Sequence, residues 1–217
     1  MTTPYSCILF DLDGTIVDSA PGILESLRFV YRELGLPVPS TAELMRWVGP
    51  PILDSFRDLA HLDVEESARA LAIYREDYIT HGVNDATIFA GMPEVLAAVK
   101  AAGIPFSLAT SKPEVPATAI LEHAGLLDLF TVITGASADE VRSAKKDVVA
   151  EALIRLRALG ADTSRPVLIG DRIHDVEGAT ANGVPTIMVE WGYGTPEERT
   201  DAIATVTTPD ELLALIL

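Results

Sequence analysis

Two acidic residues follow the first apolar run of the chain. Residues 5–10 lead directly into Asp11-Leu12-Asp13-Gly14-Thr15. In extended backbone, positions i and i+2 point to the same face, so the carboxylates of Asp11 and Asp13 lie close together. Two such carboxylates resist joint ionisation, and a bound cation or a raised pKa relieves them. The motif therefore predicts a cation site or an acid–base pair, unless it is an ordinary Asp-Gly turn.

A second acidic motif follows the most strand-like run of the chain, residues 166–170. It reads Gly170-Asp171-Arg172-Ile173-His174-Asp175. The carboxyl ends of parallel strands meet at one edge of an open sheet, so neighbouring strands would gather both acidic motifs there. Oxygen ligands with few basic neighbours suit a hard cation, and Mg²⁺ fits best. The candidate ligands are Asp11, Asp13, Asp171 and Asp175.

Hydroxyl groups follow a third predicted strand, residues 105–110. The segment Ala109-Thr110-Ser111-Lys112 offers hydroxyls and backbone N–H groups that suit a phosphoryl oxygen. Taken alone, a hydroxyl after a strand is an ordinary loop feature. Together with the two acidic motifs, it points to phosphate chemistry at the edge of a sheet.

The elements that must position these motifs alternate between strand and helix from about residue 86 onward. This alternation is typical of βαβ units around a parallel sheet, so we expect an α/β fold. Apolar spacing predicts helices at 92–103, 113–125, 145–160, 175–182 and 209–217. Short apolar runs predict strands at 105–110, 130–134, 166–170 and 185–189, beside the first strand at 5–10.

Residues 17–85 contain only helical patterns. Ser40-Thr41-Ala42-Glu43 is a capping box that opens one helix. A longer helix carries helical spacing at Val64, Ala68, Leu71, Tyr74 and Tyr78. We therefore expect residues 1–16 and 86–217 to form an α/β catalytic core, and residues 17–85 to form an all-helical insert.

The composition excludes several function classes. The 217 residues include 16 Lys and Arg against 32 Asp and Glu, which gives a net charge of −16. Such a charge repels nucleic acid and anionic membrane surfaces. No apolar run reaches the roughly 18 residues needed to span a bilayer. The single cysteine, Cys7, cannot form an internal disulfide, and the first residues lack a secretory signal, so we expect a cytoplasmic protein.

The ordered motifs resemble those of haloacid dehalogenase superfamily phosphatases over essentially the whole chain. Within that superfamily, Thr15-Ile16-Val17-Asp18-Ser19, the helical insert and residues 184–194 are most similar to the phosphoglycolate phosphatase and 5′-nucleotidase-like group. This resemblance implies a doubly wound, parallel-sheet, Rossmann-like core. It also implies that the insert is a helical cap.

The resemblance implies a role for each acidic residue. Asp11 would be the nucleophile that forms an aspartyl-phosphate. Asp13 would protonate the leaving alkoxide and then deprotonate the attacking water. Mg²⁺ would be held by the Asp11 side chain, the Asp13 backbone carbonyl and Asp171. Asp175 would orient these ligands from a second layer.

The resemblance also assigns the groups that bind phosphate. Thr110 would hold the transferring phosphoryl oxygens as a catalytic residue. Ser111, Gly14 and Thr15 would complete the phosphate site.

A catalytic lysine would neutralise the phosphate charge. The family spacing, a lysine and one residue before Asp-Val, favours Lys145 over its neighbour Lys146 and over Lys112. The chain departs here from the commoner family form, in which prolines follow the lysine.

The loop Trp47-Val48-Gly49-Pro50-Pro51 resembles the place where caps of this group meet the site. It is either a substrate contact or a plain connection between helices. The histidines have no metal-ligand spacing, and we expect His174 in an exposed loop.

We therefore predict a Mg²⁺-dependent phosphatase of a small phosphomonoester: phosphoglycolate, a nucleoside monophosphate or a sugar phosphate. A phosphosugar mutase, which returns phosphate to its sugar, is the first alternative. A signalling module that accepts phosphate on Asp11 is the second. Carbon–halogen and phosphonate hydrolases are disfavoured because those relatives lack an acid equivalent to Asp13. We expect no nucleic-acid or membrane partner, and a monomer or homodimer.

Overall fold

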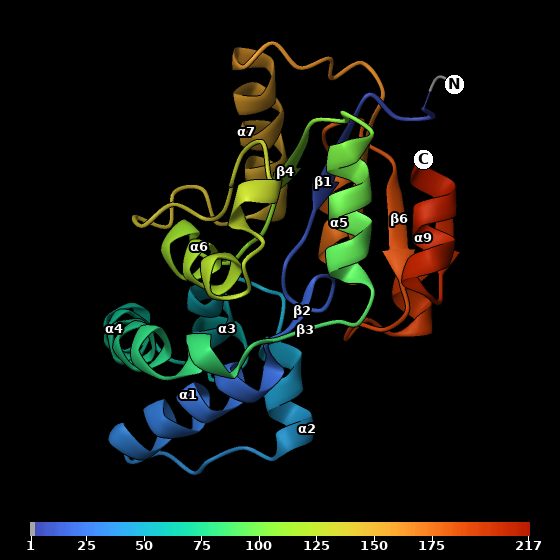
Figure 1. Ribbon diagram of the computed structural model, residues 1–217. Coiled ribbons are helices and arrows are strands. Elements are labelled where there is room, and N and C mark those ends of the chain that lie inside the picture. Colours follow the sequence, from blue (N-terminus) through green and yellow to red (C-terminus); the bar gives the residue numbers. More distant parts are fainter. Residues whose placement is uncertain (1–2) are drawn as a thin grey trace.

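The core of the protein is a five-stranded parallel sheet (Figure 1). The computed structural model describes residues 3–217. The strand order is β4-β1-β5-β6-β7, so β1 lies between two strands that come much later in the chain. The strands are β1 (Cys7–Phe10), β4 (Phe106–Leu108), β5 (Pro166–Gly170), β6 (Thr186–Val189) and β7 (Ala204–Val206).

Helices cover both faces of this sheet, because alternate residues of each strand point to opposite sides. Ile8 and Phe10 of β1 pack into one core with α5 (Met92–Ala101), α6 (Glu114–His123) and α9 (Pro209–Ile216). Cys7 and Leu9 pack into a second core with α7 (Lys145–Ala158) and α8 (Ile173–Thr180). The prediction of a doubly wound α/β core is confirmed.

A helical segment lies between the first strand and the rest of the core, in the lower part of Figure 1. It contains α1 (Ala20–Glu33), α2 (Thr41–Leu44), α3 (Ile52–Asp58) and α4 (Val64–Thr80), with short 3₁₀ turns at Met45–Trp47 and Gly82–Asp85. The chain enters this helical segment through β2 (Val17–Asp18) and leaves it through β3 (Thr87–Ile88). These two strands pair antiparallel, so both connections run side by side.

The capping box at the start of α2 is confirmed. Ser40 N donates to Glu43 Oε2 at 2.8 Å, and Glu43 N donates to Ser40 Oγ at 3.3 Å. The apolar stripe of α4 is confirmed only in part. Tyr74 and Tyr78 are buried, whereas Val64 at the first turn is 73% exposed.

Three expectations about strands are wrong in detail. Residues 130–134 form no regular strand, although Leu108 N donates to Val132 O and Thr134 N donates to Leu108 O. β2 lies inside the segment expected to be purely helical. β7 extends the sheet beyond β6, where we expected no strand, and Val206 is the buried residue among its three.

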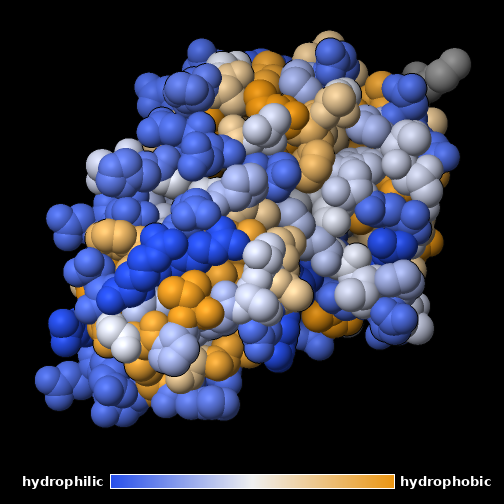
Figure 2. Space-filling model, turned by 90° about the horizontal axis from the view of Figure 1, so that it is seen from below, coloured by the Kyte–Doolittle hydropathy of each residue, from blue (hydrophilic) through white to orange (hydrophobic). Residues whose placement is uncertain are grey.

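Seen from the end that carries the helical segment, the surface is mostly hydrophilic, with hydrophobic residues in separate patches (Figure 2). Phe29, Val38 and Ile79 are among the exposed apolar side chains of this segment. Within residues 3–217, no helix has the length and apolar character needed to cross a membrane.

The ring of Phe106 ties β4 to its neighbours. Its centroid lies 5.8 Å from that of Phe10 and 4.9 Å from that of Phe130, and the side chain is 1% exposed. We expect Phe106→Ala to lower the free energy of unfolding by about 3–5 kcal/mol, because truncation leaves a cavity in the core. Urea unfolding measures this loss, and Phe29→Ala on the exposed face of α1 is the control. Equal losses for the two variants would contradict this account of the core.

Candidate active site

The carboxyl ends of β1, β4 and β5 bring the sequence motifs together at one edge of the sheet. Asp11 and Asp13 follow β1, Thr110 follows β4, and Asp171 follows β5. All four are buried. β1 pairs with both β4 and β5, so the three motifs are direct neighbours. The edge lies where the order of the strands reverses, the usual ligand position in open α/β sheets.

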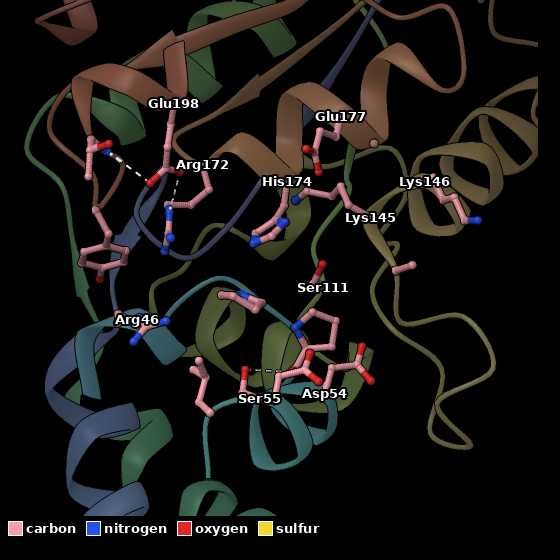
Figure 3. Close-up of a pocket in the computed structure, with 18 of the residues that line it drawn as sticks. Arg46, Asp54, Ser55, Ser111, Lys145, Lys146, Arg172, His174, Glu177 and Glu198 are labelled. Atoms are coloured by element: carbon pink, nitrogen blue, oxygen red, sulfur yellow. Dashed lines mark hydrogen bonds and ion pairs between the residues drawn. The ribbon is translucent and has the colours of Figure 1, made fainter. Parts of the chain in front are cut away.

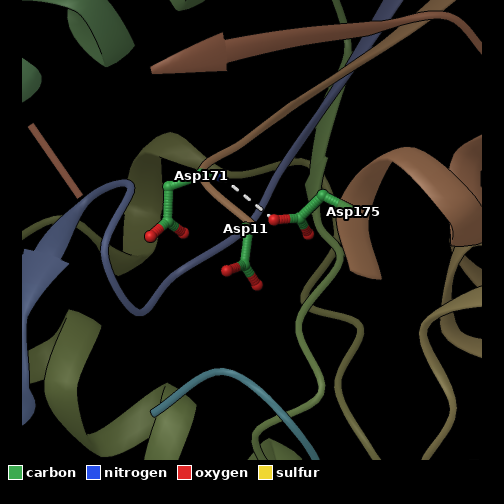
Figure 4. A group of neighbouring side chains, drawn as sticks. All are labelled: Asp11, Asp171 and Asp175. Carbon is green, nitrogen blue, oxygen red and sulfur yellow. Dashed lines mark hydrogen bonds between the residues drawn. The ribbon is translucent and has the colours of Figure 1, made fainter. Parts of the chain in front are cut away.

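Three carboxylates gather at the centre of this edge (Figure 4). Oxygen atoms of Asp11, Asp171 and Asp175 all lie within 4.8 Å of one another, and all three residues are buried. This spacing brings enough carboxylate oxygens together to hold a cation at this point. Asp13 belongs to the same edge but is not part of this group.

The turn after β1 is shaped to admit Asp171. Gly14 has φ +80°, and a Cβ on it would lie 2.2 Å from Asp171 Oδ2. Glycine is therefore required here both by backbone conformation and by space. Thr15 Oγ1 donates to Asp171 Oδ1 at 3.4 Å, and Tyr193 N donates to Asp171 Oδ2 at 2.7 Å. Thr15 and the Tyr193 backbone thus hold the carboxylate of Asp171, and Gly14 leaves room for it.

Asp175 secures the turn after β5. Its Oδ2 accepts hydrogen bonds from Asp171 N and Arg172 N, each at 3.0 Å. Its Oδ1 lies 2.6 Å from Lys145 Nζ. Asp175 therefore fixes the backbone that presents Asp171 and also faces the charged centre of the site.

Lys145 is the central cation. Its Nζ lies 2.6 Å from Asp11 Oδ1 and donates to Ala109 O at 2.8 Å. Burial alone lowers the pKa of Lys145, but Asp11 and Asp175 outweigh this effect and raise the pKa above its ordinary value. The ammonium group therefore stays charged. Lys146 is exposed, and Figure 3 shows its side chain extending away from that of Lys145.

Lys112 pairs with the second acid of the first motif. Its Nζ lies 3.1 Å from Asp13 Oδ2 and donates to Tyr78 Oη at 2.9 Å. Ser19 Oγ donates to Asp13 Oδ1 at 2.5 Å. The two lysines thus serve different acids, Lys145 at Asp11 and Lys112 at Asp13.

The buried carboxylates are short of positive charge. Burial raises the pKa of Asp11 to about 6 against the opposing effect of Lys145, with further upward contributions from Asp175 and Asp13. Burial, Asp175 and Asp11 raise the pKa of Asp171 well above its ordinary value.

Within residues 3–217, the ammonium groups in direct contact with these carboxylates are those of Lys112 and Lys145. When Asp11, Asp13, Asp171 and Asp175 are all ionised, these contacts leave two negative charges unpaired. A divalent cation supplies the missing charge and takes the all-oxygen ligands that these residues offer. The donor set therefore fits Mg²⁺.

The hydroxyl motif lies beside this centre. Thr110 is buried, and its Oγ1 accepts a hydrogen bond from Lys112 N at 3.2 Å. Ser111 lines two cavities between the sheet edge and the helical segment. The larger cavity has a volume of about 840 Å³ and the smaller about 280 Å³. Figure 3 shows Lys145 and His174 reaching the larger cavity from the core, with Arg46 and Asp54 on the opposite wall.

The loop from Trp47 to Pro51 lies at both cavities, because Pro50 and Pro51 line each of them. Arg172 donates through a guanidinium nitrogen to Val48 O, and its Nε lies 3.0 Å from Glu198 Oε2. The loop is therefore held against the core at the site, which favours the substrate-contact interpretation over a plain connection.

The expectation that His174 lies in an exposed loop is wrong. His174 belongs to the first turn of α8, is half-buried and lines the larger cavity.

Sequence reasoning gave no site role to Ser19, Tyr78 or Tyr193. Tyr193 Oη donates to Asp18 Oδ1 at 2.7 Å and accepts from Ser19 N at 2.9 Å. These contacts join the segment after β6 to the start of α1. The only sequence signal for Ser19 was its place at the end of the Thr15–Ser19 segment.

Comparisons with known proteins agree with this geometry. The sequence model of haloacid dehalogenase-like hydrolases matches residues 8–189. The chain is 41% identical over 210 residues to tyrosine-protein kinase PtkA of Mycobacterium tuberculosis, covering 94% of this chain and 70% of PtkA. It is 37% identical over 194 residues to a 5′-nucleotidase of Pseudomonas aeruginosa, covering 89% and 86%. Other relatives are named phosphoglycolate phosphatase.

Among solved structures, the crystal structure of a predicted phosphatase from Clostridium acetobutylicum superposes with a TM-score of 0.90. The two chains are 35% identical, and the match covers 97% of each. The similarity extends over the core and the helical segment alike. It therefore includes every element that contributes a residue to the site.

Proposed function

The chain belongs to the haloacid dehalogenase-like hydrolase family and is a phosphoric monoester hydrolase, and from this premise we propose that it cleaves a small phosphomonoester with Mg²⁺ through an aspartyl-phosphate. The observation that carries the proposal is the buried Asp11 carboxylate. It lies 2.6 Å from Lys145 Nζ, within the group of acids that fits a divalent cation, and beside a hydroxyl motif. A nucleophile, a charge-neutralising cation and phosphate-binding groups are thus brought together.

In the first half of the proposed reaction, a carboxylate oxygen of Asp11 attacks phosphorus. The bond from phosphorus to the ester oxygen breaks, and its electron pair stays on that oxygen. Asp13 supplies the proton, so the products are an alcohol and the aspartyl-phosphate. In the second half, Asp13 takes a proton from water, the water oxygen attacks phosphorus, and Asp11 is released with inorganic phosphate.

The surrounding groups stabilise the charge that moves during both steps. Lys145 orients Asp11 and offsets the negative charge of the transferring group. Thr110 and Ser111 bind phosphoryl oxygens. Mg²⁺, held by Asp11, Asp171 and the Asp13 carbonyl, would screen the repulsion between nucleophile and phosphate. Asp175 would keep Asp171 and Lys145 in place.

We propose that residues 17–85 act as a cap over the core formed by 1–16 and 86–217. The contacts that join the two parts near the site include Lys112 with Tyr78, Arg172 with the Val48 carbonyl, and Arg75 with Glu140. Such contacts would close the cap over bound substrate and exclude water from the site.

Phosphate release from a panel of phosphomonoesters, with and without Mg²⁺, tests the proposal. We expect metal-dependent release from at least one ester. Isomerised sugar phosphate without free phosphate would favour the mutase. A phosphorylated Asp11 that persists for minutes without turnover would favour the signalling module. Because one relative is named a tyrosine-protein kinase, the panel includes phosphotyrosine and an assay of phosphate transfer from ATP to tyrosine.

Mg²⁺ is expected to stabilise the protein even without substrate. Saturation at about 100 times the dissociation constant adds about 2.7 kcal/mol, which raises the melting temperature of a chain of this size by about 5–10 °C. Thermal unfolding with MgCl₂ and with NaCl of equal ionic strength measures the effect. Asp171→Asn is expected to abolish the difference between the two salts. An equal shift in that variant would place the ion elsewhere.

A further inference from the structure

The smaller cavity lies between the helical segment and the hydroxyl motif, and its wall is mostly apolar. Its volume is about 280 Å³. The side chains that give it this character include Ile23, Trp47, Leu71, Tyr74, Ile79 and Pro116. The rings of Tyr74 and Tyr78, which line it side by side, are stacked with centroids 5.4 Å apart and planes 9° from parallel.

The two lysines of the site divide between the cavities. Asp13 and Lys112 line the smaller cavity, whereas Lys145 lines the larger one. Ser111 lines both, so the position of the phosphoryl group is where they meet. Because Asp13 must reach the ester oxygen, the group attached to that oxygen extends from the Asp13 side into the smaller cavity.

The cations of the smaller cavity are already paired. In the part of the chain from residue 3 to 217, Lys112 and Arg75 are the basic residues that line it. Lys112 contacts Asp13, and Arg75 forms an ion pair with Glu140. An anionic leaving group would therefore lose its hydration without gaining a free cation, which is unfavourable in an apolar cavity.

We infer that the leaving group of the substrate is uncharged and carries a planar, apolar ring that packs against the wall formed by Leu71, Tyr74 and Tyr78. This inference rests on the proposed function and narrows its substrate class. Phosphoglycolate, whose leaving group carries a carboxylate, is thereby a poor substrate. Esters of an aryl-bearing alcohol carry a ring of this kind, and nucleoside monophosphates carry a planar but more polar one.

The wild-type enzyme tests the inference with three esters of primary alcohols: 2-phenylethyl phosphate, ethyl phosphate and 2-phosphoglycolate. Their leaving groups are all alkoxides, so the ring and the charge are the main differences. We expect kcat/KM for 2-phenylethyl phosphate to exceed that for each of the other two at least tenfold. Equal values, or a preference for 2-phosphoglycolate, would overturn the inference and place the leaving group in the larger cavity beside Arg46. Hydrolysis of AMP in the same assay distinguishes a nucleoside leaving group from a simple aryl alcohol.

Two variants on α4 locate the ring. Leu71 is 9% exposed and lines the cavity, whereas its neighbour Ala72 is exposed and does not line it. Leu71→Arg places an unpaired cation in the wall, so we expect the ratio of kcat/KM for 2-phenylethyl phosphate to that for 2-phosphoglycolate to fall at least tenfold. Ala72→Arg is expected to keep the wild-type ratio. Unchanged ratios in both variants, with Leu71→Arg still folded, would contradict the inference.

A binding experiment keeps this inference separate from the proposed function. If no ester is hydrolysed, the proposed function fails, and the cavity is then tested with phosphonates that cannot be cleaved. Calorimetric titration with 2-phenylethylphosphonate and ethylphosphonate is expected to show at least tenfold tighter binding of the first. Equal binding of the two phosphonates would overturn the inference whether or not the protein is a phosphatase.

Discussion

Asp11→Asn is expected to lower kcat for phosphate release by about 10⁴-fold or more. The neutral amide has nearly the shape of the carboxylate but cannot form the aspartyl-phosphate, and loss of a catalytic nucleophile typically has an effect of this size. Asp11 is buried against Lys145, and asparagine keeps an oxygen for that contact. The fold should therefore survive. Steady-state phosphate release measures the loss of kcat, and the melting temperature measures whether the fold is retained.

Asp147→Asn is the matched control for this prediction. Asp147 is an exposed acid in the first turn of α7, two residues from Lys145. The same change of charge there is expected to leave kcat within about twofold of the wild-type value, since surface substitutions usually have small effects. More than 1% of wild-type activity in Asp11→Asn would exclude Asp11 as the nucleophile.

Lys145→Met is expected to damage both stability and catalysis. The side chain is buried with its Nζ 2.6 Å from both Asp11 and Asp175, so its removal leaves two buried carboxylates without their partner. Breaking a buried ion pair in this way costs about 3–5 kcal/mol. Loss of an electrostatic stabiliser of the transferring group lowers kcat by about 10²–10³-fold. Urea unfolding and phosphate release measure the two effects.

Lys146→Met provides the comparison one residue along the same helix. Its side chain is exposed, so we expect stability and kcat close to those of the wild type. Mg²⁺ should stabilise Lys145→Met more than it stabilises the wild type, because the ion takes over part of the missing positive charge. Equal losses in the two lysine variants would show that the contact between Lys145 and Asp11 has no role in the reaction.

The edge of the sheet at which the site forms could be predicted because strand and motif are adjacent in the sequence. Asp11, Thr110 and Asp171 each follow an apolar run directly, and parallel strands present their carboxyl ends on one side. The fold class could be predicted from the alternation of strand and helix patterns after about residue 86. These features depend on local sequence, which is why they could be read without the structure.

The contacts between the helical segment and the core could not be predicted in the same way. Lys112 meets Tyr78, and Arg172 meets the Val48 carbonyl, only because the helices dock in one particular orientation. The choice between Lys145 and Lys146 depended on the exact start of α7, since successive helix positions point about 100° apart. A shift of one residue in the start of α7 would bring Lys146 to the position that Lys145 occupies.

The position of β1 in the middle of the sheet has a consequence for synthesis on the ribosome. Ile8 pairs with Phe106, 98 positions later, and Cys7 pairs with Pro166, 159 positions later. At about 5–20 residues per second, the first strand waits about 10–30 s for its second partner. During that time its four apolar residues have an unpaired edge, which is the condition under which nascent chains aggregate. The contacts within the helical segment are local, so this segment can fold during the interval. It can then shield the first strand from other nascent chains on the same messenger RNA.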